Sequence, residues 1–524
     1  MLWLEARTPG WRPGMRVLLL CGLFLLVTRL PALLHPRAID YEQVYGVVAI
    51  EMLHGGLPYQ AAIERKPPLL FVLYAAVLGV AGPGNWPALH LVALVWTLAT
   101  MWLLWLIAHR LFDPDAGLAA ALLYGLFMAW ADYRDLAFNG ELIMNLPVVA
   151  AVALAFRPGA PRLRLELFVA GLLIAVAFLF KQPSGISGIA IGVYLLDPAY
   201  RARRALSWTA TAGELTLLAA GFLGTLGACA LVLRHLGILQ EALYWTVLSQ
   251  AAVFGAGTWV FWDRALSNAA FFALETAPLL LATVLSIRAH AGHAGVWRGR
   301  GPEFRALLVL LAVSCLGVAA NGQFLFHYFL RLLPALALLA APAAVALWNG
   351  HGLGAHPWLT PSRYRLWLIF SAVLFLVVDT AGLARYRLPG DAAVYVREHS
   401  APTDRIFVWG QGDKQVGLYL DAMRRPASRY IASFPLTGHI FGSPVSWDPS
   451  FDTSDRIVPG SWENLAADFA VHPPRYIIDT DAVRNRPVYV MTRYPFLRDY
   501  LAANYRIVHR GTSGIVYGRT GAPQ

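Results

Sequence analysis

Long apolar runs recur through most of the chain, and they constrain its fold more than any other feature. From Met15 to about Leu383 these runs are about 15–25 residues long and carry few charges, which suits helices that cross a bilayer. Of the 524 residues, 58% are hydrophobic and only 14% are charged. A soluble protein of this size cannot cover its surface with so few charges. The sequence therefore predicts a polytopic α-helical membrane protein.

We expect about eleven transmembrane helices from the apolar runs and the turn residues between them. The predicted spans are residues 16–34, 87–108, 117–131, 142–156, 165–180, 184–197, 209–233, 268–288, 306–321, 328–348 and 365–384. A further stretch, Pro67–Ala81, is short and begins with two prolines. Counting it as a span would reverse the side of every later arginine cluster. We therefore expect it to form a helix at the outer membrane interface.

The distribution of arginines sets the expected orientation, because cytoplasmic loops carry an excess of Lys and Arg. With a cytoplasmic N-terminus, the cytoplasmic loops hold 13 arginines: Arg110, Arg157, Arg162, Arg164, Arg201, Arg203, Arg204, Arg288, Arg298, Arg300, Arg305, Arg363 and Arg365. The opposite loops hold 7 basic residues: Arg37, Arg65, Lys66, Arg134, Lys181, Arg234 and Arg264. The sequence thus predicts an integral membrane protein whose N-terminus is cytoplasmic and whose loop 35–86 and C-terminal region are extracytoplasmic.

These loop arginines also account for the net charge of +11. The sequence has no Lys/Arg-rich run with interleaved aromatic residues, the pattern that would indicate nucleic-acid binding. Membrane lipids are therefore the expected surroundings. The cysteines, Cys21, Cys229 and Cys315, all lie in apolar runs. They provide neither a disulfide framework nor a zinc site.

The character of the sequence changes after Arg385, where charges, prolines and short β-like runs appear. We therefore expect a transmembrane domain over residues 1–388 and a soluble domain over residues 389–524. Strand candidates are residues 405–409, 428–434, 475–479, 505–508 and 514–517, and helix candidates are 391–399, 414–423, 461–471 and 495–504. This alternation is typical of a small α/β domain. The run Gly410-Gln411-Gly412-Asp413 is best explained as a strand-to-helix turn.

Charged residues gather in the first outer loop, residues 35–86. Asp40 and Glu42 follow the first span, and a helical pattern of Val44, Val47, Val48, Glu51 and Met52 ends at Gly55-Gly56. Tyr59, Glu64, Arg65 and Lys66 precede Pro67-Pro68. Charges this close to hydrocarbon are costly unless they pair or carry out a function. One interpretation is a hydrated loop with internal Glu64–Lys66 or Asp40–Arg37 pairs, and the other is a functional site.

The order of these residues resembles the first outer loop of the C-type glycosyltransferase superfamily. The matching pattern is Asp40-x-Glu42, Gly55-Gly56-x-Pro58-Tyr59 and Lys66-Pro67-Pro68-Leu69-Leu70. It is most similar to bacterial relatives of the dolichyl-phosphate-mannose–protein mannosyltransferases (glycosyltransferase family 39) and of the aminoarabinose transferase that modifies lipid A. Further along, Glu141 opens the fourth predicted span, Lys181-Gln182-Pro183 forms a tight outer turn, and His327-Tyr328-Phe329 with Arg331 opens the tenth.

The resemblance implies an inverting enzyme of a bacterial inner membrane. It would transfer a sugar from a polyprenyl-phosphate donor to a glycan, lipid or protein acceptor outside the membrane. Asp40 is the favoured catalytic base. Tyr41 separates two acids that usually adjoin in the family, so Glu42 remains the alternative. Glu42 and Glu141 are candidates to orient the acceptor, hold the donor sugar or bind a metal. The family includes members with and without a divalent metal, and no other cofactor is implied.

The departing lipid phosphate gains negative charge and needs cations near it. Lys66 is the first candidate, followed by Lys181, His327 and Arg331. Glu64, Tyr59 and Tyr328 complete the expected substrate-binding set.

Structural roles compete with these assignments. Lys181 suits an interfacial lysine, His327 and Tyr328 suit an aromatic belt, and Glu141 suits a helix N-terminus. Tyr244–Trp262 suits an interfacial segment. The rings of Trp130, Trp245, Trp259 and Trp262 suit either a belt or stacking on a sugar.

Two other functions remain open. One is a transporter or flippase for a lipid-linked sugar or lipid, although the spans carry few charges and no duplicated half with broken helices is evident. The other is a non-catalytic assembly protein whose outer domain binds a partner.

Overall fold

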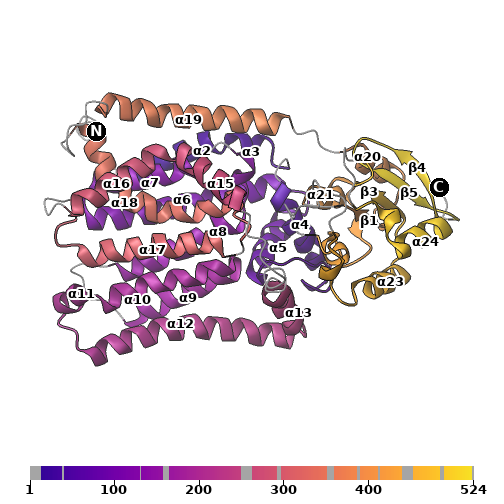
Figure 1. Ribbon diagram of the computed structural model, residues 1–524, viewed down its shortest axis with the longest axis horizontal. Helices are drawn as coiled ribbons and strands as arrows, with labels where there is room; N and C mark the ends of the chain where they lie inside the picture. The colour runs from indigo at the N-terminus through magenta and orange to yellow at the C-terminus, as the bar shows by residue number, and fades with distance from the viewer. Residues whose placement is uncertain are drawn as a thin grey trace. The chain divides into compact units, whose positions relative to one another are not determined.

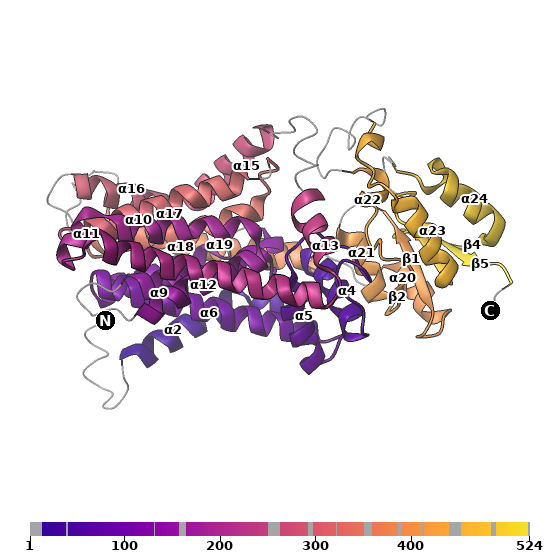
Figure 2. The same cartoon turned by 90° about the horizontal axis from the view of Figure 1, so that it is seen from below.

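The computed structural model describes residues 13–37, 40–129, 132–156, 164–249, 262–291, 297–320, 322–350, 359–385, 390–410, 413–439, 452–483 and 489–521 (Figures 1 and 2). The chain forms two compact units. The helical unit comprises Met1–His35, His90–Cys229 and Val260–Leu383. The mixed unit comprises Pro36–Leu89, Ala230–Trp259 and Ala384–Gln524. The first loop and the C-terminal region therefore belong to the same unit.

The helical unit is built from helices at all of the predicted span positions. They are α2 (Pro13–Thr28), α3 (Leu30–Leu34), α6 (Trp86–Leu111, which begins in the mixed unit), α7 (Pro114–Phe127), α8 (Gly140–Ala155), α9 (Arg164–Phe180), η2 (Gln182–Ser187), α10 (Gly188–Leu196), α11 (Pro198–Arg203), α12 (Trp208–His235, which ends in the mixed unit), α15 (Trp262–Glu275), α16 (Ala277–Ala291), α17 (Gly301–Ala319), η4 (Phe326–Leu332), α18 (Leu333–Asn349) and α19 (Pro361–Ala384). A short 3-10 turn, η1 (Tyr133–Leu136), precedes α8. The long helices α12, α17 and α19 run in roughly one direction (Figures 1 and 2).

Several of these helices are long and apolar enough to cross a membrane. Among the described residues there are 5: α6, α12, α17, α18 together with η4, and α19. The count rises to 6 if α15 and α16, which are bent by 83° at their junction, form one span. The protein is thus an integral membrane protein, while the number of eleven spans and the direction of insertion stay predictions.

Local sequence signals explain where individual helices begin. Asp113 accepts a hydrogen bond from the Ala116 amide at 2.8 Å, and Pro114 occupies the first helical position of α7. Both features are favoured at helix starts, because the first amides lack partners within the helix. Pro68 likewise opens α5 (Pro68–Ala81), which confirms the helix predicted there. Its position at the membrane interface stays a prediction.

The mixed unit contains a five-stranded sheet in the order β2-β1-β3-β5-β4. Its strands are β1 (Arg405–Trp409), β2 (Arg425–Pro426), β3 (Tyr476–Asp479), β4 (Tyr505–Arg510) and β5 (Ile515–Arg519). Strands β2, β1 and β3 are parallel, whereas β5 is antiparallel to both β3 and β4.

Helices accompany the sheet, and all four helices predicted in this region are present. The elements of the C-terminal region are α20 (Asp391–Glu398), α21 (Asp413–Asp421), α22 (Phe434–Thr437), η6 (Ser454–Arg456), α23 (Ser461–Val471), η7 (Met491–Arg493) and α24 (Pro495–Asn504). The first loop adds α4 (Asp40–Leu53) and α5, and Ala230–Trp259 adds α13 (Leu239–Leu243) and the π-helical turn η3 (Tyr244–Leu248). The Gly410–Asp413 run lies between β1 and α21, although Gln411 and Gly412 are outside the described residues.

The strand predicted at residues 428–434 is wrong. The second strand is the short β2, and the following chain turns into α22. The polar groups of this segment bond to side chains in place of a strand ladder. The Asp468 carboxylate accepts hydrogen bonds from the Ser428 hydroxyl at 2.8 Å and the Arg429 amide at 3.0 Å. The strand prediction fails because the local sequence does not reveal such a distant partner.

Asp479, at the end of β3, is a buried carboxyl group whose protonation affects the stability of the protein. Its carboxylate accepts hydrogen bonds from the amides of Asp481 (3.0 Å) and Ala482 (3.1 Å), but burial has the larger effect and raises its pKa from 3.8 to about 6. The folded state therefore holds this proton more tightly than the unfolded state. The resulting stability is complete below pH 4 and is lost as the pH rises through 6.

We expect Asp479→Asn to stabilise the full-length protein at pH 7 by about 1–3 kcal/mol, because the amide oxygen can still accept both hydrogen bonds without a buried charge. Thermal unfolding in detergent between pH 4 and pH 8 measures the effect. The variant should match the wild type near pH 4 and exceed it at pH 7. Parallel pH profiles would show that Asp479 does not titrate in this range.

Candidate active site

Two helix ends bring Glu141 and Lys181 together in the helical unit. The Asn139 side chain accepts a hydrogen bond from the Leu142 amide at 2.9 Å and starts α8, which places Glu141 in the first turn. The positive end of a helix dipole favours an acid at this position. Helix α9 ends directly before Lys181 and packs against α8. The Lys181 Nζ atom lies 2.8 Å from the Glu141 Oε1 atom, and the two side chains are only 9% and 3% exposed.

The 3-10 segment η4 adds the third side of this cluster. The Tyr328 ring centroid lies 4.8 Å from the Lys181 ammonium, within the range of a cation–π contact. The His327 ring packs edge-on against Tyr328, with centroids 4.7 Å apart. The Asn145 amide, one turn along α8 from Glu141, donates to the Leu330 carbonyl at 3.3 Å and fixes η4 against α8.

Arg331 places a second buried cation in this cluster. Its side chain rests against Gly317 of α17, where an added Cβ atom would lie 2.0 Å from the Arg331 Nη1 atom. A larger residue at position 317 would displace the guanidinium from this place. Arg331 is 5% exposed, and its Nε and Nη2 atoms have no hydrogen-bond partner among the described residues. Glu141 lies close enough to interact with it electrostatically.

The structure therefore brings together Glu141, Lys181, His327, Tyr328 and Arg331, which come from three separate stretches of sequence. One carboxylate faces two cations, so the cluster keeps an excess of positive charge. A buried arginine fork with unpaired N–H groups is suited to an anion with several oxygens, such as a phosphate. We call these five residues the helical-unit cluster.

A second group lies in the first loop, in the mixed unit. Glu42 is fully buried in α4 and interacts electrostatically with Tyr74 of α5. The Tyr45 ring packs edge-on against Tyr74, with centroids 5.5 Å apart, and the Lys66 Nζ atom lies 5.9 Å from the centre of the Tyr45 ring. Asp40 opens α4, but its side chain lies outside the described residues. Helix α4 thus carries both candidate bases.

The expected Glu64–Lys66 pair is present, with 3.3 Å between Lys66 Nζ and Glu64 Oε1. Burial raises the pKa of Glu64, but the charges of Lys66 and Arg65, together with hydrogen bonds from these two residues, hold the pKa below its ordinary value. Glu64 therefore remains a carboxylate that partly neutralises Lys66. The Tyr59 hydroxyl donates to the Lys66 carbonyl at 2.8 Å, so Tyr59 shapes the backbone at Lys66. Arg37, the other expected partner in the loop, pairs with Asp421 of α21.

Sequence reasoning missed the role of Glu51. This acid lies in α4, is 2% exposed, and pairs with Arg425 at 2.7 Å, in the C-terminal region. The available signal was its place among the apolar residues of the helical pattern. An acid on a buried helix face needs a basic partner, but the pattern does not say which one.

The structure describes two of the four tryptophans that suit a belt or stacking on a sugar, and their role stays a prediction. Trp245 packs edge-on against Phe434, with ring centroids 6.3 Å apart. Trp262 opens α15, and its ring centroid lies 6.2 Å from that of Phe324. Trp130 and Trp259 lie outside the described residues. In the described part of the chain, no group of three or more His, Cys, Asp or Glu side chains is arranged to hold a metal ion. The described acids of the two groups do not form a metal centre by themselves.

Part of the chain matches a known protein family. Residues 65–227 match the family model of the dolichyl-phosphate-mannose-protein mannosyltransferases. This segment contains Lys66, Glu141 and Lys181. No curated protein sequence matches the chain.

Solved structures resemble nearly the whole chain. ArnT from Cupriavidus metallidurans in the apo state is 15% identical, with a TM-score of 0.55 over 96% of this chain and 98% of that chain. The same protein bound to undecaprenyl phosphate gives 15% identity and a TM-score of 0.51, over 96% and 99% of the two chains. The oligosaccharyltransferase AglB from Archaeoglobus fulgidus, in complex with an inhibitory peptide and a dolichol-phosphate, gives 13% identity and 0.52, over 97% and 74%. The chain therefore has the fold of the C-type glycosyltransferase superfamily, and the resemblance first seen in its outer loop is confirmed.

Proposed function

We propose that this protein is an inverting membrane glycosyltransferase that transfers a sugar from a polyprenyl-phosphate donor to an acceptor on the extracytoplasmic face of a bacterial inner membrane. The observation that carries the proposal is the buried Arg331 guanidinium beside the Glu141–Lys181 pair. The fold supports it, since ArnT has been solved with undecaprenyl phosphate and AglB with a dolichol-phosphate.

Each of the two groups, taken by itself, offers cations for the donor phosphate. In the helical-unit cluster, Arg331 would present its fork of N–H groups to two phosphate oxygens, with Lys181 as a point charge. In the first loop, Lys66 is the candidate cation. His327 and Tyr328 would line the same region. The phosphate gains charge as the sugar departs, so cations held in a buried site lower the barrier most at that moment.

The acceptor hydroxyl is a poor nucleophile, and a carboxylate that takes its proton makes it a better one. We assign this role to Asp40, with Glu42 as the alternative on the same helix. Glu141 would keep Lys181 oriented and contact the sugar or acceptor. Direct attack by the acceptor needs one base and no covalent intermediate, so the configuration at the sugar carbon inverts.

A transporter or flippase for a lipid-linked sugar is the second candidate. The 83° bend between α15 and α16 favours it, because broken helices often line transport sites. Two assays separate the candidates. Mass spectrometry of envelope glycans and lipids, with and without the gene, should show one missing sugar if the protein is a transferase. Movement of a lipid-linked sugar across reconstituted vesicles without transfer to an acceptor would support transport.

The role of Lys66 can be tested by binding. We expect Lys66→Met to weaken the affinity for undecaprenyl phosphate by about 10- to 100-fold, because a hydrogen bond to a charged group contributes about 1.5–3 kcal/mol. The control is Arg65→Gln, which removes an equal charge one residue away. The Arg65 guanidinium lies 4.3 Å from the Phe434 ring centre and stacks against the C-terminal region. Equal losses in both variants would show a general charge effect and not a site at Lys66.

A further inference from the structure

Glu51 joins the first loop to the C-terminal sheet across 374 residues of sequence. Its two carboxylate oxygens accept hydrogen bonds from Arg425 at 2.8 and 2.7 Å. The Arg405 Nη1 atom lies 3.9 Å from the Glu51 Oε2 atom. Arg405 opens β1 and Arg425 opens β2, and the two are paired in register in the parallel ladder. Neighbouring strand starts thus present two arginines to one carboxylate.

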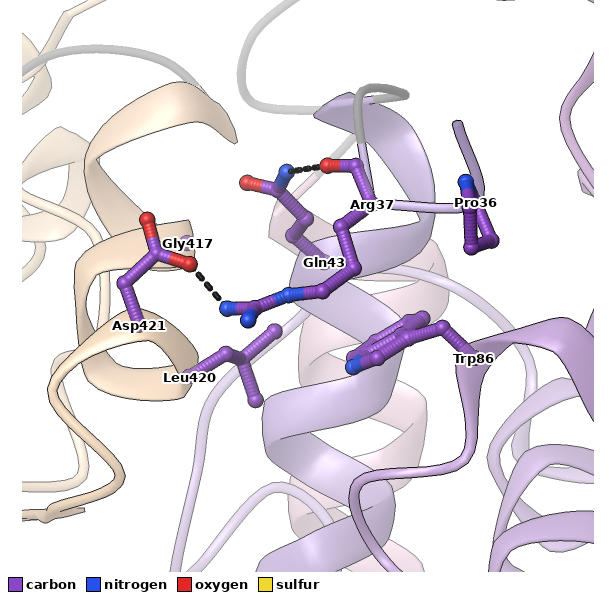
Figure 3. A pocket seen from close by; sticks show the side chains of 7 residues that line it. All are labelled: Pro36, Arg37, Gln43, Trp86, Gly417, Leu420 and Asp421. Atoms are coloured by element: carbon purple, nitrogen blue, oxygen red, sulfur yellow. Dashed lines mark hydrogen bonds and ion pairs between the residues drawn. The ribbon is translucent and has the colours of Figure 1, made fainter. Parts of the chain in front are cut away.

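Other contacts fix the same helix near its N-terminal end. An added Cβ atom on Gly417 of α21 would lie 1.9 Å from the Gln43 Oε1 atom, so α4 and α21 approach closely there. Figure 3 shows Arg37 directed toward Asp421, while the Gln43 amide donates to the Arg37 carbonyl at 2.8 Å. These side chains line a narrow pocket that leaves no room for a water molecule.

The contacts divide α4 into two faces. Gln43, Val47 and Glu51 follow each other at intervals of four residues, and so lie on one side of a helix. This face meets α21 and the strand starts through Gly417 and Arg425. Glu42 and Tyr45 lie on the other side, where Tyr45 packs on α5. The orientation of Glu42 toward α5 therefore depends on how the opposite face is held.

We infer that Glu51 is a positioning residue, through which Arg425 and Arg405 of the C-terminal region set the rotation of α4 and thereby aim its acids at the reacting groups. This inference rests on the proposed function. It gives the C-terminal region a defined task, which is to hold the helix that carries Asp40 and Glu42. Glu51 itself lies more than two helical turns from Asp40 and takes no part in the chemistry.

The test compares Glu51→Gln with Asp468→Asn in the full-length protein reconstituted in lipid nanodiscs. Asp468 is a matched control, because it binds Arg429 at 2.8 Å inside the C-terminal region. Both variants lose a carboxylate that pairs with an arginine about one third exposed, but only Glu51 lies on α4. The measurements are kcat, the KM for the lipid-linked donor, and hydrogen–deuterium exchange of the peptide spanning α4.

For Glu51→Gln we expect kcat to fall by about 100-fold with the donor KM nearly unchanged, because misplacing a catalytic group by 1 Å costs about that much. Exchange in α4 should become faster. Asp468→Asn should leave both quantities near the wild-type values. Arg425→Gln should lower kcat by about 10-fold only, since Arg405 remains near the carboxylate.

If Glu51→Gln does not fold, Arg425→Gln alone decides the matter by the same readouts. Equal kcat values and equal exchange in the Glu51, Arg425 and Asp468 variants would overturn the inference. A wild-type protein without any transferase activity would overturn the proposed function instead. The exchange of α4 would still report whether Glu51 holds the helix.

Discussion

An Asp40→Asn variant is expected to lose sugar transfer by about 10²- to 10⁴-fold, the range that a positioned general base contributes. Asparagine keeps the size of the side chain but cannot take a proton from the acceptor. The donor KM should change little, because Asp40 is assigned to the acceptor. The measurement is steady-state transfer from a polyprenyl-phosphate sugar by the purified protein in nanodiscs, and thermal unfolding checks that the variant is folded.

Glu42→Gln is the control that separates the two candidate bases. Both acids lie in the first turn of α4, but Glu42 is fully buried and interacts with Tyr74 of α5. If Asp40 is the base, Glu42→Gln should reduce transfer less than Asp40→Asn does. The reverse order would move the role to Glu42. Full activity in both variants would exclude either acid as the base.

Features that depend on local sequence were predictable. Helices form at each position where an apolar run predicted one, and α5 begins at Pro68 as predicted. In the C-terminal region, the alternation of elements predicted the four longest helices and all strands except the second, but not the short α22. The Glu64–Lys66 pair was also foreseen, because two residues of opposite charge lie close in sequence. In each case, the partners are neighbours along the chain.

Features that depend on packing between distant elements were not predictable. The sequence identified Glu141, Lys181 and Arg331 separately, but only the packing of α8, α9 and η4 places them together. Gly317 gave no sign that it makes room for Arg331. The failed strand has the same cause, since Asp468 satisfies the polar groups of residues 428 and 429. A single sequence contains these partners but not their distances.

The charge balance of the helical-unit cluster leads to the second large effect. Glu141 lies among two buried cations, so Glu141→Gln leaves both Lys181 and Arg331 without their carboxylate. We expect a loss of about 3–5 kcal/mol in the free energy of unfolding, which is the range for removing one partner of a buried ion pair. Lys181→Gln should cost less, since Arg331 stays beside Glu141. The control Arg134→Gln breaks a pair with Asp132 in which the arginine is 47% exposed, and should cost under about 1 kcal/mol.

Combining the two changes gives a sharper test than either alone. In the Glu141→Gln background, Lys181→Gln removes an unbalanced buried charge, so it should stabilise the protein although it destabilises the wild type. A double-mutant cycle by denaturant unfolding in detergent measures this change of sign, with an expected coupling of about 1–3 kcal/mol. Additive losses would show that the two side chains do not interact.

Glu141→Gln alone should also bind undecaprenyl phosphate more tightly while transferring sugar more slowly, because the phosphate then takes the place of the missing carboxylate. Weaker binding would place the lipid phosphate elsewhere.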